Sequence, residues 1–304
     1  MADAPNFTAS LALAAPDSTS FRFFPTAEPL SQFVEYLYVS HIPSDFAAQI
    51  EAMRVPEAEA QLVFAIEQGN AFPGGTPLGG GLRACLFLQP AHLQTIPIAS
   101  SIRLAIGASL RATGLRLVLP RGTASLADTP LCGLDELWGA EARELRERMI
   151  LAASESARLR VLEQHLQQRA RRVERPSRTA QRAFEIVRRA HGEISTEQLA
   201  RACGCTSRTL RTSIAAQAGI APKQLARIVR IRYALDLLSG SVPLSAAAVS
   251  SAFSDQAHMS REFRELFGEM PSRLGSKIRS PAVPAFDAEW NLLSTGLLVL
   301  PKSP

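Results

Sequence analysis

The side chains with the clearest chemical potential lie in two short segments near the end of the chain. In the first segment Arg208, Arg211 and Thr212 are interleaved with the apolar residues Leu210 and Ile214 at helical spacing. An arginine guanidinium can donate two parallel hydrogen bonds to guanine or to a phosphate. This segment therefore combines an apolar face for a protein core with a polar face suited to nucleic acid.

A second segment about 49 residues later repeats this division, since Arg211 and Ser260 hold corresponding positions. The residues expected on its polar face are Gln256, His258, Ser260 and Arg261, and those on its apolar face are Met259, Phe263 and Phe267. A glutamine amide can pair with adenine. His258 is either an ordinary exposed helical histidine or a contact to a base or phosphate.

The first polar face requires two helices and a tight turn to position it. Ser195 and Gln198 have the spacing of a capping box, which predicts a helix from about Thr196. Gly204 can adopt the positive φ of a sharp turn, and Thr206 can cap the following helix. Gly219 is expected to end that helix.

The second polar face follows the same plan. A helix is expected from about Ser245, with a turn near Ala252 and Phe253, and either Ser254 or Asp255 is expected to cap the next helix. Gly268 would end that helix, and Pro271 would prevent its continuation. The duplication predicts two helix-turn-helix units.

A continuous helix from Pro222 to Ser239 is expected between the two units, with Gly240 after it. Its predicted buried stripe is Leu225, Ile228, Ile231, Leu235 and Leu238. Such a helix could hold two recognition helices about 34 Å apart, one turn of DNA. Its basic residues Lys223, Arg227 and Arg230 are candidate phosphate contacts that would set the register.

The segments FSDQAHMSREFRELFGEMPS, ISTEQLARACGCTSRTL and RIRYALDLL together resemble the DNA-binding domain of the AraC family of bacterial transcription regulators. The resemblance covers about 100 residues and implies that both recognition helices contact an operator. The implied DNA-contact positions are Arg208, Arg211, Thr212, Gln256, His258, Ser260 and Arg261, and Thr209, on the same outward face of the first recognition helix, is a further expected DNA contact.

This sequence departs from the family pattern in the second unit. Ala252 stands where the family usually has glycine before the Phe of the turn, and an alanine at positive φ is strained by roughly 1 kcal/mol. Ala247 and Ser251 replace large aliphatic residues. We therefore expect a looser second unit.

Charge separates the two halves of the chain. Residues 175–279 carry 17 basic and 8 acidic side chains, net +9, whereas residues 1–174 carry 15 basic and 18 acidic, net −3. A basic domain on a mildly acidic chain is typical of phosphate binding, although a solvated helix face is the simpler alternative for any single cluster.

The N-terminal half is predicted to be rich in strands, so the fold class is α+β. The expected strands are AQLVFAI, ACLFLQP, SIRLAIGASL and LRLVLP, separated by Gly and Pro clusters. Leu30 to Val39 is expected to be helical. Residues 141–171 are expected to form one long helix, with Leu145, Met149, Leu159, Leu162 and Leu166 on its apolar face.

The order FRFFPTAEPLSQFVEYLYV, strands, then LDELWGAEARELRERM also resembles the cupin-like sensory domains of some AraC-type regulators. This second resemblance depends on the pair Trp138 and Gly139 and on the general order. It implies a β-barrel-like sensor followed by a helical connector that could form a dimer surface.

Four parts of the chain are predicted. These are a β-rich sensory or dimerisation domain (1–140), a helical connector and linker (141–176, with the linker at 169–177), a double helix-turn-helix domain (177–280) and a tail (281–304). The tail has an apolar patch from Trp290 to Leu300, which would fold back on the body or across a partner subunit.

Enzymatic and metal sites are not expected. Only His41 and His92 precede the connector, far apart, and the Gly-rich stretch from Gly74 to Gly81 lacks the Gly-Lys-Ser/Thr of a phosphate-binding loop. Cys203 and Cys205 are expected in a core, Cys85 and Cys132 are expected to be buried or incidental, and His165 and His191 are expected on helix surfaces. No apolar run reaches the roughly 18 residues of a membrane span, and no signal directs the chain out of the cytoplasm.

The sequence thus predicts an effector-responsive, cytoplasmic transcription regulator without a cofactor. Its expected partners are double-stranded DNA, a small-molecule effector, a second copy of the chain and RNA polymerase. The alternative is a protein-interaction module that retains the helical scaffold without tight DNA reading, which Ala252 and the alanine-rich helix before it favour.

Overall fold

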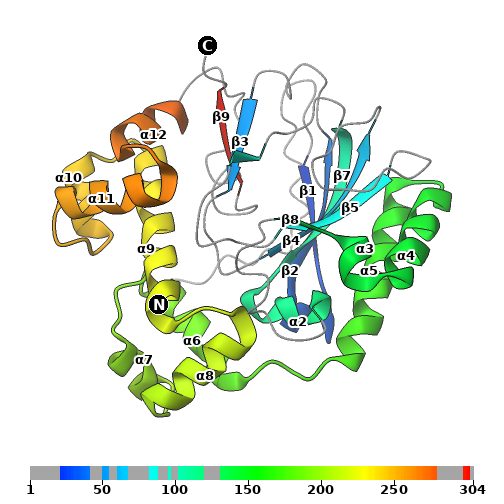
Figure 1. Ribbon diagram of the computed structural model, residues 1–304, viewed down its shortest axis with the longest axis horizontal. Coiled ribbons are helices and arrows are strands. Elements are labelled where there is room, and N and C mark those ends of the chain that lie inside the picture. Colours follow the sequence, from blue (N-terminus) through cyan, green and yellow to red (C-terminus); the bar gives the residue numbers. More distant parts are fainter. Residues whose placement is uncertain are drawn as a thin grey trace.

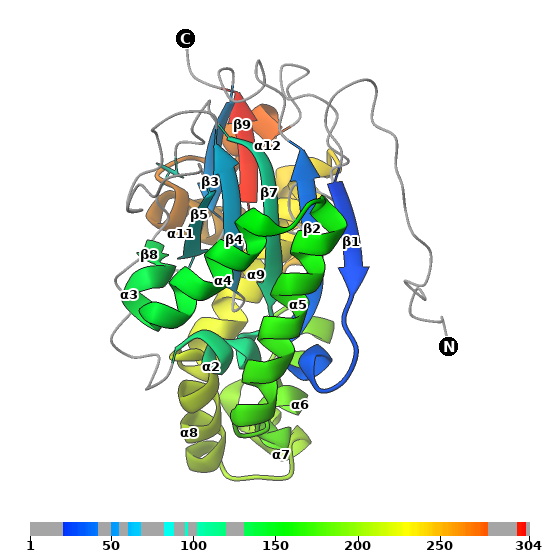
Figure 2. The ribbon, with the colours of Figure 1, turned by 90° about the vertical axis from the view of Figure 1, so that its right-hand side faces the viewer.

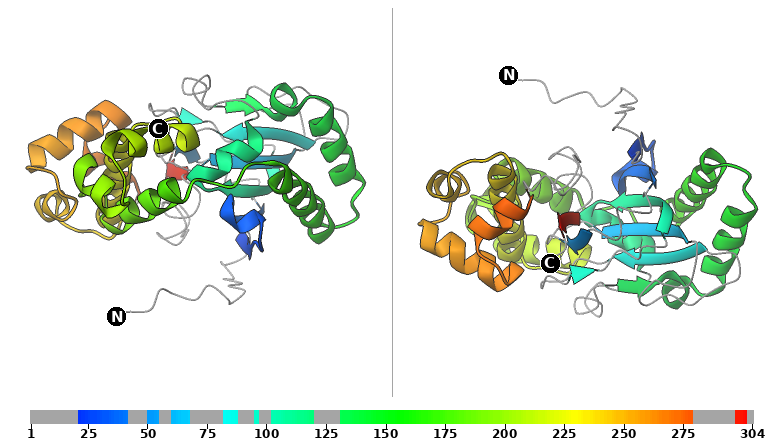
Figure 3. Two further views of the ribbon diagram at one scale, coloured as in Figure 1. Left: turned by 90° about the horizontal axis from the view of Figure 1, so that it is seen from below. Right: turned by 90° about the horizontal axis from the view of Figure 1, so that it is seen from above.

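The computed structural model describes residues 21–41, 50–54, 60–67, 82–87, 95–96, 102–119, 131–278 and 297–301. A sheet lies between two groups of helices, with the C-terminal helices at one end and α3 to α5 at the other (Figure 3). None of the helices in these ranges combines the length and the apolar composition that a membrane span requires.

The larger sheet has six antiparallel strands in the described ranges (Figure 1). In order across the sheet they are β1 (Phe21–Pro25), β2 (Val34–His41), β7 (Ile102–Leu110), β4 (Ala60–Glu67), β5 (Leu82–Phe87) and β8 (Leu131–Gly133). Apolar side chains of the central strands, such as Leu37, Phe64 and Ile106, are fully buried. The expected strands around residues 60, 84 and 102 are confirmed.

The end of the tail folds back on the body. β9 (Leu297–Pro301) pairs antiparallel with β3 (Ile50–Arg54), which also pairs with β6 (Thr95–Ile96). Of the two arrangements that the sequence left open for the tail, the structure shows the fold back on the same chain. The other apolar tail residues, 290–296, lie outside the described residues, as do His92 and the Gly-rich stretch.

Helices α3 (Leu134–Trp138), α4 (Ala140–Leu151) and α5 (Glu155–Arg172) complete the N-terminal half. α5 packs on β2 and β7, and α4 packs on β5 (Figure 2). Trp138 Nε1 donates a 2.8 Å hydrogen bond to the carbonyl of Val118. The connector helices are therefore part of the same core as the sheet.

Three predictions for the N-terminal half are wrong. Leu30 to Val39 is not a helix, because only the short η1 (Leu30–Gln32) precedes strand β2, whose aromatic and β-branched residues favour an extended chain. LRLVLP is not a strand: η2 (Ala112–Gly114) leads into the helical turn α2 (Leu115–Val118). A short apolar run does not distinguish a buried strand from a buried helical turn.

The third error concerns the connector, which is two helices rather than one. Ala152 is extended, and the hydroxyl of Ser154 accepts from the Ala157 amide at 3.2 Å, so a new helix is capped there. α5 continues to Arg172 and α6 begins at Arg178, which leaves only 173–177 as non-helical linker, shorter than the predicted 169–177. The five apolar residues predicted to face inward are all buried.

Seven helices form the C-terminal half in the described ranges. They are α6 (Arg178–Arg189), α7 (Thr196–Ala202), α8 (Ser207–Ala218), α9 (Pro222–Ser239), α10 (Leu244–Ser250), α11 (Gln256–Phe267) and α12 (Pro271–Ile278). α6 to α8 share one core with the start of α9, and α10 to α12 share another with its end. The predicted bounds of α9 are confirmed, whereas α6 and α12 were not predicted and Pro271 begins a helix.

Candidate nucleic-acid interface

The first helix-turn-helix unit has the predicted local geometry. Ser195 Oγ accepts from the Gln198 amide at 3.2 Å, and Gln198 Oε1 accepts from the Ser195 amide at 2.9 Å, so the capping box is complete. Gly204 has φ +66°, and the Thr206 hydroxyl caps α8 by accepting from the Thr209 amide at 3.1 Å. α8 is thereby fixed in direction at its start.

The buried face of α8 is formed by Leu210 and Ile214, which are 0% exposed. The side chains predicted to read DNA, Arg208, Thr209, Arg211 and Thr212, are all exposed. Thr209 and Thr212 also form local hydrogen bonds, to the Thr206 hydroxyl at 3.0 Å and to the Arg208 carbonyl at 3.1 Å. The polar face of α8 is therefore separate from its core face.

The second unit has the same plan with a less favourable turn. Ala252 has φ +54°, in the left-handed region that favours glycine. Asp255 Oδ1 accepts from the His258 amide at 2.6 Å and caps α11, and this hydrogen bond lowers the pKa of Asp255. Of the two capping candidates in the sequence, Asp255 is the cap.

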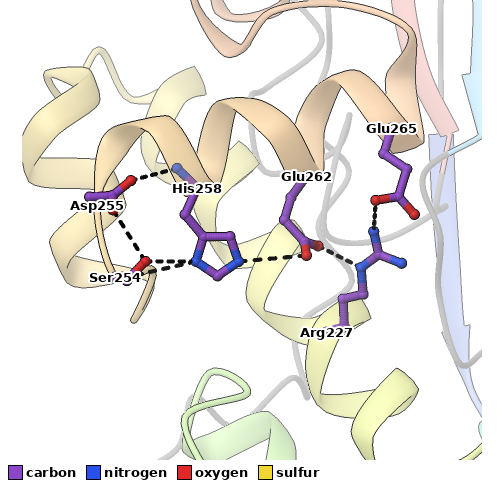
Figure 4. Close-up of polar contacts among 6 residues, drawn as sticks. All are labelled: Arg227, Ser254, Asp255, His258, Glu262 and Glu265. Atoms are coloured by element: carbon purple, nitrogen blue, oxygen red, sulfur yellow. Dashed lines mark hydrogen bonds and ion pairs between the residues drawn. The ribbon is translucent and has the colours of Figure 1, made fainter.

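On α11 the predicted reading residues differ in how free they are. Gln256 and Arg261 are exposed, and the Ser260 hydroxyl donates to the Gln256 carbonyl at 2.8 Å. His258 points back toward the protein: its Nδ1 lies 3.0 Å from Ser254 Oγ, and its Nε2 lies 3.7 Å from Glu262 Oε1 (Figure 4). Gln256 and Arg261 are the freer of the candidates on this helix.

The three basic residues of α9 have different surroundings. Arg227 Nε donates to Glu262 at 2.5 Å, and Arg227 Nη2 lies 2.9 Å from Glu265, so this guanidinium joins α9 to α11 (Figure 4). Arg230 is half-buried, with its guanidinium 5.0 Å from the centre of the Phe253 ring. Lys223 is exposed.

One side of α8 faces the N-terminal half of the molecule. α8 packs on η2 and α2, and a solvent-open pocket of about 450 Å³ lies between α8, Arg116 of α2 and the linker residues Arg175 and Ser177. We call this space the junction pocket. Arg208, Thr209 and Thr212 line it, whereas Arg211 does not.

Titratable groups elsewhere in the described residues do not gather into a metal site. No group of three or more His, Cys, Asp or Glu side chains there could hold a metal ion. Cys203 and Cys205 are free and half-buried against the first core, and burial raises the pKa of the Cys203 thiol. The side chains of Cys85 and Cys132 lie outside the described residues.

His165 was predicted on a helix surface and is instead 6% exposed. Its ring lies 5.3 Å from that of Trp138, and burial lowers its pKa to about 4. His191 is exposed, as predicted, but it lies in the turn after α6 with φ +48° and stacks on Tyr233.

A family model described as a helix-turn-helix domain matches residues 199–276, which span α7 to α12 except for their outermost residues. A structure of a probable AraC family transcriptional regulator from Rhodopseudomonas palustris CGA009 is 31% identical to this chain, covering 34% of it and 100% of that chain, with a TM-score of 0.31. The chain belongs to the AraC family of transcriptional regulators. It is a DNA-binding regulator with a helix-turn-helix domain.

Other matches extend over more of this AraC-family chain at lower identity. ToxT from Vibrio cholerae O395 is 10% identical, with 84% of this chain and 96% of that chain covered and a TM-score of 0.38. ToxT from Vibrio cholerae strain SCE256 with bound unsaturated fatty acid is 11% identical, with 86% and 96% covered and a TM-score of 0.38. No curated protein matches this chain.

Proposed function

We propose that this regulator reads DNA with two helices, α8 and α11, which enter successive major grooves on one side of the duplex. The observation that carries the proposal is the duplicated unit: each recognition helix is capped, anchored by its own core and exposed on its polar face. α9 connects the units, and its 18 residues span roughly 27 Å. That length is close to the 34 Å between major grooves on the same face.

The exposed arginines are the main base-reading groups in this proposal. Arg208, Arg211 and Arg261 would each bind guanine or phosphate, and Gln256 would bind adenine. The hydroxyl groups of Thr209, Thr212 and Ser260 would add hydrogen bonds to DNA from shorter side chains. Lys223 would bind a phosphate and help to set the register.

Arg227 and His258 receive a different role from the one that the sequence suggested. Both are held by Glu262, and Arg227 is also held by Glu265. We therefore assign them to positioning α11 on α9, with Arg230 packed beside them under Phe253.

The remaining parts would regulate this DNA-binding domain. Residues 1–140 would form the sensor for a small-molecule effector, 141–176 the connector with a surface for a second copy, and 177–280 the double helix-turn-helix domain. Support comes from the packing of α4 and α5 on the sheet and of α8 on η2 and α2. A change in the N-terminal half would thus reach the first recognition helix directly, and RNA polymerase would read the result at the promoter.

A protein-interaction module remains the second candidate, because Ala252 strains the turn of the second unit. The test is repeated selection of a random-sequence duplex pool by the parent protein and by an Arg211→Ala plus Arg261→Ala variant. Enrichment of a site with two contact blocks, lost in the variant, supports DNA reading. If the parent enriches no sequence and the variant behaves in the same way, the protein-interaction module replaces DNA reading as the proposed function.

A further inference from the structure

The junction pocket carries positive charge that the protein does not neutralise. Arg175 and Arg208 line it, and their guanidinium groups have no hydrogen-bond or ion-pair partner among the residues that the structure describes. Arg116 also lines it and lies 3.1 Å from Glu174, a carboxylate that is 85% exposed. Three guanidinium groups against one carboxylate favour an anion in this space.

The walls of the junction pocket include short hydroxyl side chains. Ser177 Oγ and Ser213 Oγ lie 2.8 Å apart, one from the linker and one from α8. Its volume of about 450 Å³ is within the range of about 300 to 1,000 Å³ of small-molecule sites. The space fits a metabolite better than a single ion.

The pocket-lining residues of α8 form one stripe along the helix. Arg208, Thr212 and Ala216 are spaced four residues apart, with Thr209 and Ser213 beside them. Arg208, Thr209 and Thr212 are also proposed to read DNA. A molecule held in the pocket would occupy groups that the operator needs.

We propose that the junction pocket binds a small metabolite with an oxyanion, and that its binding and operator binding by α8 exclude one another. In this proposal the oxyanion binds to Arg175 and Arg208. The exclusion rests on the proposed function of α8, whereas the binding of the oxyanion does not.

Inorganic phosphate, a small oxyanion, is the probe for the first arm of the test. Its binding to the full-length protein is followed by phosphorus NMR, with chloride holding the ionic strength constant. Arg175→Ala should weaken phosphate binding about tenfold, the effect of one charged hydrogen bond. Arg160→Ala, which removes an exposed arginine of α5 outside the pocket, should leave it unchanged.

The second arm measures binding to the selected operator with and without phosphate at the same ionic strength. Phosphate should weaken operator binding by the parent and by Arg160→Ala, and should have little effect on Arg175→Ala. Absence of phosphate binding to the parent, or equal binding by Arg175→Ala, overturns the proposal. A third outcome also overturns the proposal: Arg175→Ala binds the operator more weakly, and phosphate does not affect operator binding by the parent. Arg175 would then bind a DNA phosphate rather than a metabolite.

The two arms separate this proposal from the proposed function. If the parent selects no operator, the proposed function fails. Phosphate binding in the first arm still decides whether the junction pocket is an oxyanion site.

Discussion

At the scale of single residues, the partners of a side chain decide whether it can reach DNA. Arg211, Gln256 and Arg261 are exposed on the polar faces of their helices, whereas Arg227 is held by two carboxylates. Residue type and spacing predicted all four as candidates equally well. The carboxylates that engage Arg227 lie 35 and 38 residues later in the chain, so the spacing along one helix gives no sign of them.

Ala252 provides a test of strain in the second turn. Glycine at this position removes the Cβ that disfavours its φ of +54°, and the greater freedom of glycine in the unfolded chain offsets part of the gain. We expect Ala252→Gly to raise the free energy of unfolding by up to about 1 kcal/mol in urea denaturation. Ala246→Gly, at an exposed position of helix α10, should lower it by about 1 kcal/mol. Destabilisation by both substitutions would show that the turn is not strained.

His165 makes stability depend on pH. Burial lowers its pKa to about 4, whereas the unfolded chain takes up the proton near 6.5, so its contribution is present above pH 6.5 and is lost as the pH falls toward 4. Relative to His165→Gln, the parent should lose about 2 kcal/mol of unfolding free energy between pH 7 and pH 5. Denaturant unfolding at both pH values measures the difference, and parallel behaviour of the two proteins would contradict a buried neutral histidine.

At the scale of elements, the helix-turn-helix units could be predicted almost residue by residue because their signals are local. The Ser195 and Thr206 caps, the glycine turns and the apolar stripe of α9 all act within a few residues. The N-terminal half was harder to predict because non-local pairing decides its elements. β2 is a strand because it pairs with β1 and β7. The helical conformation of α2 depends on the direction in which the chain leaves β7. The break before α5 had a local signal in Ser154, which the apolar periodicity obscured.

The contact between α9 and α11 makes a prediction that separates structure from DNA binding. Arg227→Met removes the hydrogen-bonded partner of Glu262, whose side chain is 17% exposed, so we expect a loss of about 1–2 kcal/mol of unfolding free energy. The slope of log operator affinity against log salt should not change. Lys223→Met, on the same helix and exposed, should leave stability unchanged and reduce the magnitude of that slope by about one unit. A reduced slope in Arg227→Met with unchanged stability would instead make Arg227 a phosphate contact.

At the scale of the whole molecule, the sheet and the DNA-binding helices contact each other at several points. Glu35 of β2 lies 3.7 Å from Arg188 of α6, α8 rests on η2 and α2, and β9 lies near α12 (Figure 1). Among these contacts, those of α8 make the first recognition helix the one most directly coupled to the N-terminal half.

Burial raises the pKa of the Asp236 carboxyl on α9 to about 6, although the positive charge of Arg232 opposes this effect.

The central claim is that α8 and α11 read two separate major grooves. Footprinting of the selected duplex tests it most directly, with the parent, Arg211→Ala and Arg261→Ala compared at concentrations that saturate the parent. We predict two protected blocks about 10 base pairs apart, of which Arg211→Ala weakens one and Arg261→Ala the other. A single protected block, or loss of the same block in both variants, would contradict the two-helix reading.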